Sequence, residues 1–421
     1  MTDPKELGII SVYIQFCIYT KLYILTECRT KGKKMKKITI KAGPPVEGSD
    51  FYGREKELKY AWEYQISKGV SLLLSAPRRV GKTSFSKKML KMAEENGWKT
   101  MYLDLEGIST ESEFVKLFKE RLKSEKWWDK AWNKTKNVVF KIFDSIKEVK
   151  VAESGISLNS GAWRDDTYEK IRQLIENAGK ILIVMDELAV YLYDLLKQEN
   201  GREKVEFFME WLRNLRQTTK ACWIFCSSVG IENFTSMHQL SKHLNDLYPF
   251  HIEAFSEDEA KDFILHLNVD KNVRFTEEHI QYILDKLMWY LPYFIQILVN
   301  KINFLFCVEG KQLTNAAIDE AYNLLITENY FKTWDERLKY YDEFEDNARK
   351  ILKLCVSPNG ISRDDLLINL TANKNEKEKT EDTLSKLLEM LKNDGYMVEH
   401  NGKYIFHSPL LRDFWYARFI K

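Results

Sequence analysis

The hydrophobic residues of this chain form short continuous runs that alternate with longer segments of helical periodicity. The segment Ile181–Met185 is apolar throughout, as expected for a central parallel strand that is covered on both faces. Strands that alternate with helices of this length predict a doubly wound α/β domain, which we expect over residues 51–255. The five predicted strands are Val70–Leu74, Thr100–Leu105, Lys180–Glu187, Ala221–Ser228 and Tyr248–Phe255.

Beyond residue 255 the pattern becomes helical. Ser256 precedes Asp258 and Glu259, an arrangement typical of a helix start, because a hydroxyl caps free amides there and acidic groups oppose the helix dipole. A small helical domain is therefore expected over residues 256–330. Its further helices are predicted at Thr276–Leu287, Pro292–Cys307 and Thr314–Glu328. A polar, aromatic linker follows at 330–345.

Residues 346–421 predict a winged helix-turn-helix. The order is three helices and then a hairpin, and Asn401-Gly402 marks a tight two-residue turn. The helices are expected at Asn347–Cys355, from Ser362 onward, and at Lys379–Leu391, with the hairpin at Gly395–Phe406. The last segment is rich in apolar side chains, which need a partner, and the rest of the molecule is the nearest one. They are Leu410, Leu411, Phe414, Trp415 and Phe419.

Two segments fit these domains less well. The insertion 109–178 contains an amphipathic helix at Thr110–Lys123, a cluster of Trp127, Trp128 and Trp132, and a hairpin-like stretch at 149–160. The tryptophans are interpreted as a satellite core, with a partner surface as the less favoured alternative. Residues 1–50 form an N-terminal extension. Its first 34 residues are interpreted as a mis-assigned or peripheral extension, with a membrane anchor disfavoured because Gln15 and Lys21 interrupt the apolar stretch.

Candidate chemistry is concentrated in the segment 73–84, which reads LLSAPRRVGKTS. An apolar strand, a loop ending in Gly-Lys-Thr and a helical pattern form the context of a phosphate-binding loop. Main-chain amides of such a loop bind phosphate, Lys82 would bridge the β- and γ-phosphates, and Thr83 would ligate Mg²⁺. Ala76 stands where the usual pattern begins with glycine. The remaining candidate nucleotide contacts in this loop are Pro77, Arg78, Arg79, Val80, Gly81 and Ser84.

Two acids end the predicted strand at 180–187. Carboxyl ends of parallel strands are where open α/β sheets bind ligands. Asp186 would hold Mg²⁺ directly or through water, and Glu187 would act on the attacking water as a general base or by orienting it. Ser227 and Ser228 end another predicted strand and would lie beside the γ-phosphate.

With these motifs the chain resembles the archaeal-type ATPases, which belong to the STAND group of P-loop NTPases and are related to AAA+ proteins. The resemblance covers roughly residues 50–421 and rests on FYGREKEL, APRRVGKTS, IVMDE, WLRNLRQ and CSSVG. It implies ATP or ADP and Mg²⁺ as cofactors, Gly53 and Arg54 near the adenine, and a helical lid over the nucleotide. It also implies a sensor serine at Ser227 or Ser228. In the lid, Pro292 matches the family's GxP motif, whereas Tyr290 replaces its glycine.

Composition adds a few limits. The 421 residues exceed one ordinary domain, and a net charge of +2 excludes a strongly polybasic or polyacidic protein. The six cysteines lack the spacing of zinc sites, so reduced thiols in a cytoplasmic protein are expected. Cys222 and Cys226 should share one buried face of their strand.

We therefore expect an ATP-hydrolysing, STAND-type switch whose C-terminal winged helix restrains the ATPase. A DNA-binding AAA+-like ATPase is the alternative, and it is disfavoured because residues 346–421 carry 13 basic and 11 acidic side chains. A non-hydrolysing nucleotide-bound scaffold is a third possibility. Arg213 and Arg216 share a helix face and are interpreted as ordinary surface or ion-pair residues, or else as an arginine finger toward a neighbouring subunit. A homo-oligomer or a protein partner is compatible with the sequence.

Overall fold

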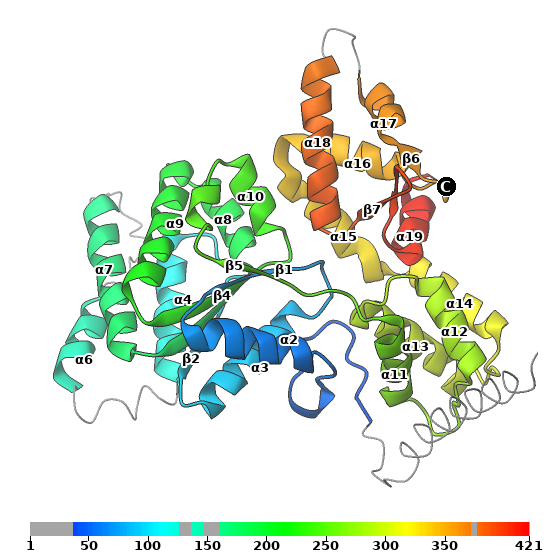
Figure 1. The fold of residues 1–421 in the computed structure, drawn as a ribbon, viewed down its shortest axis with the longest axis horizontal. Coiled ribbons are helices and arrows are strands. Elements are labelled where there is room, and N and C mark those ends of the chain that lie inside the picture. Colours follow the sequence, from blue (N-terminus) through cyan, green and yellow to red (C-terminus); the bar gives the residue numbers. More distant parts are fainter. Residues whose placement is uncertain (1–36, 126–135, 147–159, 372–376, 421) are drawn as a thin grey trace, which may run out of the picture.

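The computed structural model describes residues 37–125, 136–146, 160–371 and 377–420. Their centre is a parallel sheet of five strands in the order β2-β3-β4-β1-β5. The strands are β1 (Leu72–Ser75), β2 (Lys99–Asp104), β3 (Ile181–Asp186), β4 (Ala221–Cys226) and β5 (Tyr248–His251). Each coincides with a predicted strand, although β5 ends four residues earlier than expected. The predicted α/β class is confirmed, and Figure 1 shows the sheet between its covering helices.

Alternate residues of the strands enter two hydrophobic cores, one on each face of the sheet. Leu72, Val184 and Ile224 face one core, which also contains helix α3 (Lys82–Glu95), while Leu73 and Ile183 face the other. Cys222 and Cys226 lie together on the first face, as predicted, and both are free thiols. Residues of α4 (Glu111–Ser124), α7 (Ser160–Ala178), α8 (Leu188–Leu196) and α9 (Gly201–Thr218) form the second core with the sheet.

The insertion between β2 and β3 confirms its predicted helix. Thr110 caps α4 by accepting a hydrogen bond from the amide of Glu113, and the Glu113 carboxylate accepts from the amide of Thr110. A further helix, α6 (Lys136–Ser145), precedes α7. The three tryptophans and the expected hairpin at 149–160 lie almost wholly outside the described residues, as do residues 1–36.

Four helices form a helical domain after the α/β domain, which we refer to as the lid: α11 (Glu257–His266), α12 (Glu277–Leu287), α13 (Pro292–Cys307) and α14 (Asn315–Thr327). The last three agree with the predicted helices to within about a residue at each end. The first, α11, begins where the sequence predicts a helix start, and Ser256 caps it as expected. Ile38 pairs with Leu267 of the lid, so residues just before the α/β domain pack against the domain that follows it. No helix of the described ranges is long and apolar enough to cross a membrane.

The aromatic linker is folded into short helices, α15 (Lys332–Arg337) and η6 (Leu338–Phe344), and it is not an extended tether. Trp334, Leu338 and Tyr341 are buried there. The C-terminal domain then contains α16 (Glu345–Leu354), β6 (Ile361–Ser362), α17 (Arg363–Leu370), α18 (Lys377–Asn393), β7 (Met397–His400), β8 (Lys403–Phe406) and α19 (Pro409–Phe419). Its antiparallel sheet has the order β6-β8-β7.

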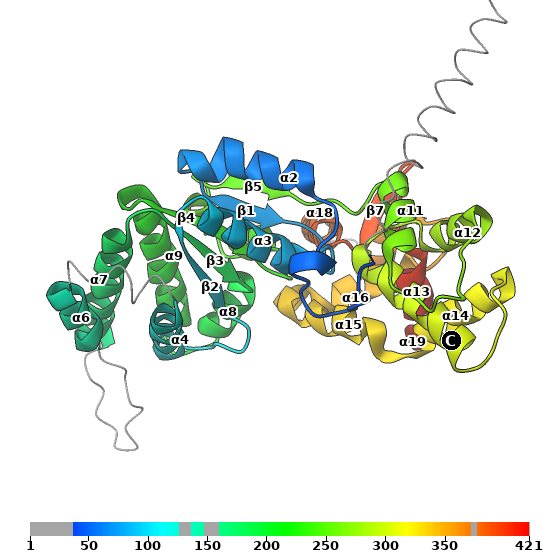
Figure 2. The same ribbon diagram turned by 90° about the horizontal axis from the view of Figure 1, so that it is seen from below.

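This C-terminal domain is a winged helix that packs on the rest of the molecule. Asn401 and Gly402 have φ of 51° and 72°, the left-handed pair required by the predicted tight turn. The predicted apolar segment is covered: Leu410, Leu411, Phe414 and Trp415 are buried in the same core as the lid and α3. Figures 1 and 2 show the α/β domain on one side, with the lid and winged helix together on the other.

Candidate nucleotide-binding site

The Gly-Lys-Thr loop connects β1 to α3. Gly81 precedes the first helical residue with φ of 104°, a left-handed conformation that glycine adopts without strain. The free amides at the start of this fourteen-residue helix make a favourable site for an anion. Ala76 is not among the described residues with positive φ, so its methyl group is accommodated where the usual pattern has glycine.

Lys82 folds back over this loop. Its Nζ donates hydrogen bonds to the carbonyl oxygens of Ala76 at 2.7 Å and Pro77 at 3.0 Å. Burial lowers the pKa of Lys82, and the carboxylates of Glu187 and Asp186 oppose part of that shift. A bound phosphate would offer the same ammonium a negatively charged acceptor in place of neutral carbonyls, which gives a stronger hydrogen bond.

Asp186 is surrounded by donors from three elements. Its Oδ2 accepts from the Thr83 hydroxyl at 2.6 Å and from the Tyr102 hydroxyl at 2.8 Å. Its Oδ1 accepts from the main-chain amide of Glu187 at 3.1 Å and contacts the Cys226 thiol at 3.2 Å. The predicted metal-binding pair, Thr83 and Asp186, is therefore brought together. Tyr102 was not identified from the sequence, where it lies inside an ordinary strand pattern.

The donor chemistry around Asp186 fits Mg²⁺ bound together with phosphate. Thr83, Asp104 and Asp186 present oxygen atoms to one cavity, and oxygen is the ligand type that Mg²⁺ prefers. Burial, with the nearby charges of Asp186 and Glu187, raises the pKa of Asp104, so a cation there is favourable. No group of three or more metal-ligating side chains exists among the described residues. Phosphate oxygens and water would complete the coordination, as is usual for Mg²⁺.

Glu187 adopts a left-handed conformation with φ of 59° at the end of β3. Its Oε2 accepts hydrogen bonds from the Ser228 amide at 3.0 Å, the Ser227 hydroxyl at 3.3 Å, and the Ser228 hydroxyl. Its Oε1 lies 3.9 Å from the guanidinium of Arg337. Burial alone would raise the pKa of Glu187, but Arg337 and the Ser228 hydrogen bonds hold it below its usual value. The carboxylate is thus ionised and able to accept a proton at neutral pH.

These side chains line a cavity of about 570 Å³, large enough for the phosphates and ribose of a nucleotide. Its lining includes most of the predicted site residues: Arg78, Arg79, Gly81, Lys82, Thr83, Ser84, Asp186, Glu187 and Ser228. Pro77 is not among its lining residues, although its carbonyl accepts from Lys82.

A smaller, mostly apolar pocket of about 60 Å³ adjoins this cavity and shares five lining residues with it: Val46, Gly81, Ser84, Pro292 and Gln296. Its apolar lining fits the face of a base. Val80 and Arg54 line it, whereas Gly53 does not. The Arg54 guanidinium donates to the Glu253 carbonyl at 2.6 Å and lies 4.9 Å from the Phe255 ring centroid. Arg54 therefore forms part of the wall of this pocket, and its contacts with Glu253 and Phe255 hold its guanidinium in place.

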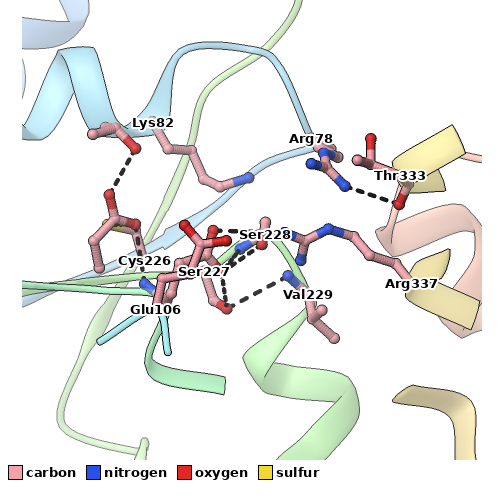
Figure 3. Close-up of polar contacts among 12 residues, drawn as sticks. Arg78, Lys82, Glu106, Cys226, Ser227, Ser228, Val229, Thr333 and Arg337 are labelled. Atoms are coloured by element: carbon pink, nitrogen blue, oxygen red, sulfur yellow. Dashed lines mark hydrogen bonds and ion pairs between the residues drawn. The ribbon is translucent and has the colours of Figure 1, made fainter. Parts of the chain in front are cut away.

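Three arginines surround the cavity. Arg79 lies over the ring of Tyr293, 4.5 Å from its centroid, and Arg78 donates to the carbonyl of Thr333 at 2.9 Å. Burial, and then the neighbouring charges of Arg337 and Arg79, lower the pKa of Arg78 to about 9. Arg337, at the end of α15, was not identified from the sequence. Figure 3 shows Arg78, Lys82 and Arg337 converging on one space from the loop and from the linker.

The two arginines of α9 have other surroundings. The described residues that line the cavity include neither Arg213 nor Arg216. Arg216 forms a 2.8 Å ion pair with Asp246 and is only 4% exposed, so it has the structural role expected of an ion-pair residue.

The fold, a five-stranded parallel sheet followed by helices and a winged helix, is like that of AAA+ ATPases with a winged helix. The Walker-type ATPase PABY2304 of Pyrococcus abyssi superposes with a TM-score of 0.55 at 17% identity, covering 89% of this chain and 99% of its own. The Aeropyrum pernix ORC2 protein, solved in complexes with ADPNP and ADP, superposes with a TM-score of 0.52 at 10% identity over 91% and 98%. No protein-family profile matches the chain, and no curated protein matches its sequence.

Proposed function

We propose that this protein binds ATP with Mg²⁺, hydrolyses it, and couples the nucleotide state to its lid and winged helix as a STAND-type switch. The observation that carries this proposal is the convergence of Lys82, Thr83, Asp186 and Glu187 on one cavity of about 570 Å³. Lys82 would contact the β- and γ-phosphates, and Thr83 with Asp186 would hold the metal ion. The buried free thiols of Cys222, Cys226 and Cys355 fit a reducing compartment such as the cytoplasm.

Hydrolysis would proceed by in-line attack of water on the γ-phosphorus. The bond from this phosphorus to the β–γ bridging oxygen breaks as the bond to the water oxygen forms, and ADP leaves with the electron pair. Glu187 orients the water and accepts its proton, because the hydrogen bonds from Ser228 favour the ionised carboxylate. Lys82 stabilises the negative charge that is redistributed over the phosphates.

The winged helix contacts two loops of the candidate site, the phosphate loop and the loop after β4. These contacts support a restraining role. A methyl group at Gly395 would lie 2.8 Å from Cβ of Pro77, so the turn between α18 and β7 approaches the phosphate loop closely. Asp394 accepts hydrogen bonds from the Gly230 amide at 3.0 Å and the Tyr341 hydroxyl at 2.8 Å. Gly230 follows Ser228 by two residues. Movement of either loop with nucleotide would therefore disturb winged-helix docking.

Two substitutions separate binding from chemistry. Lys82→Ala should abolish ATP binding, because the main phosphate cation is lost, whereas Glu187→Gln should keep binding and lose turnover. Calorimetric titration with Mg-ATP and a phosphate-release assay measure the two properties. Lys91→Ala is the matched control, because Lys91 is an exposed lysine of the same helix. Equal ATP affinity in the native protein and the Lys82→Ala variant would contradict the assignment of the loop.

A further inference from the structure

Arg337 differs from the other cations of the site in where it comes from. It ends α15, between the lid and the winged helix, yet it lines the same cavity as Lys82, Thr83 and Asp186. Its side chain is 16% exposed. The guanidinium of Arg337 thus reaches the cavity from a segment that lies more than 250 residues after the phosphate loop in the sequence.

The guanidinium of Arg337 is incompletely bonded. Its Nη2 lies 3.9 Å from Oε1 of Glu187, at the outer limit of an ion pair. Its Nη1 is buried and has no hydrogen-bond partner within the described parts of the chain. A buried charged donor without an acceptor is unfavourable, so it indicates a place where a ligand completes the bonding. An anion in the cavity would do so, since guanidinium groups bind phosphate oxygens through two parallel hydrogen bonds.

The backbone just before Arg337 is held by hydrogen bonds from two directions, one from the phosphate loop and one from the winged helix. The carbonyl of Thr333 accepts from Arg78 of the phosphate loop at 2.9 Å. The carbonyl of Trp334 accepts from the Tyr396 hydroxyl of the winged helix at 2.6 Å. Helix α15 therefore holds Arg337 in a defined position, and it touches the phosphate loop and the winged helix at the same time.

We propose that Arg337 is a γ-phosphate ligand supplied by the same chain, and that it distinguishes ATP from ADP; this rests on the proposed ATPase function. Glu187, which Arg337 contacts, would act on water at the γ-phosphorus, so the guanidinium lies on the γ-phosphate side of the cavity. When ATP binds, both Nη groups of Arg337 donate hydrogen bonds to the γ-phosphate, and the Glu187 carboxylate becomes free to bind water. When ADP is bound, Arg337 keeps only its long contact with Glu187, and α15 loses one attachment to the site.

The test compares Arg337→Ala and Arg337→Lys with the native protein. Arg337→Ala should slow single-turnover hydrolysis by about 100-fold or more, in the range found when a stabilising donor or arginine finger is removed. Affinity for ADP should stay within about twofold, while affinity for a non-hydrolysable ATP analogue falls by roughly tenfold or more, because only ATP carries the group that Arg337 binds. Arg337→Lys should retain part of the activity, and added guanidinium ion at millimolar concentration should partly restore Arg337→Ala.

Lys339→Ala is the matched control, because it removes an exposed charge from the same linker. It should change neither hydrolysis nor nucleotide selectivity. If Arg337→Ala lowers ADP and ATP-analogue affinity equally, or behaves like Lys339→Ala, the inference is wrong and Arg337 only supports the linker. If the native protein binds no nucleotide at all, the proposed function itself fails, which is a separate result. Should Arg337→Ala not fold, the ADP-to-ATP comparison in Arg337→Lys decides the matter.

Discussion

The carboxylate of Asp394, at the end of α18, accepts a hydrogen bond of 3.0 Å from the main-chain amide of Gly230, although 164 positions separate the two residues. The same loop holds Glu187 through the amide and hydroxyl of Ser228. Asn393 and Asn233 lie beside this contact, 3.1 Å apart between Nδ2 and Oδ1. One short loop thus touches Glu187 at one end and the winged helix at the other.

Under the proposed function, removing this contact should release a restraint on ATP hydrolysis. Asp394→Ala leaves the Gly230 amide and the Tyr341 hydroxyl without their acceptor, which costs about 1–3 kcal/mol of docking free energy. Basal hydrolysis should rise, as measured by steady-state phosphate release. Asp364→Ala, which alters an exposed acid of α17, is the control and should have no effect. A rate that stays unchanged in Asp394→Ala would count against restraint. Deleting the whole domain is a weaker test, because α19 packs in one core with the lid.

Asp394 should also make stability depend on pH. Burial raises its pKa from 3.8 to about 6, although Tyr341, Gly230 and the charges of Lys82 and Arg337 lower it in part. The folded state therefore retains a proton between about pH 4 and 6 that the unfolded chain has lost. The resulting stability is fully present below pH 4 and disappears as the pH rises through 6. Urea unfolding at several pH values should show this loss in the native protein and not in Asp394→Asn. Parallel pH profiles would disprove it.

A chain that starts at Met35 should fold and bind nucleotide like the full chain. It keeps Ile38, whose amide donates to the His266 carbonyl at 2.8 Å and whose carbonyl accepts from Asn268 at 2.7 Å. It also keeps Lys41, whose amide donates to Gln296 at 2.8 Å. Melting temperature and ATP affinity should equal those of the full chain. A loss of several degrees would show that residues 1–34 contribute to stability.

Ile38→Asp, in contrast, should lower the melting temperature, because it buries a charge against the lid.

The protein should bind duplex DNA only weakly. Helix α18 carries as many acidic as basic side chains, so phosphate neutralisation contributes little. The C-terminal end of α18 is also occupied by the contacts of Asn393 and Asp394 with the α/β domain. Fluorescence anisotropy at physiological salt should give a Kd above micromolar. Binding below micromolar that weakens steeply with salt would favour the DNA-binding alternative.

Local patterns were sufficient to predict the strands, the Gly-Lys-Thr loop and the pairing of Thr83 with Asp186. Each depends on residues that are neighbours in sequence or on the rule that parallel strands end at one edge. Arg337, Tyr102 and Asp394 were missed because their roles arise only when distant elements pack together. In the sequence, Arg337 is one cation among several polar residues of a linker. Nothing within that segment indicates that α15 packs against the phosphate loop.

The close approach of Gly395 to Pro77 has a consequence for regulation in both directions. The carbonyl of Pro77 accepts from Lys82, and a phosphate that attracts Lys82 removes this hydrogen bond from Pro77, the residue that the α18–β7 turn approaches. Under the proposed function, ATP binding and docking of the winged helix therefore share a coupling free energy, which is reciprocal by thermodynamic necessity. Any macromolecule that captures the displaced winged helix would strengthen ATP binding by the same factor by which ATP strengthens its capture.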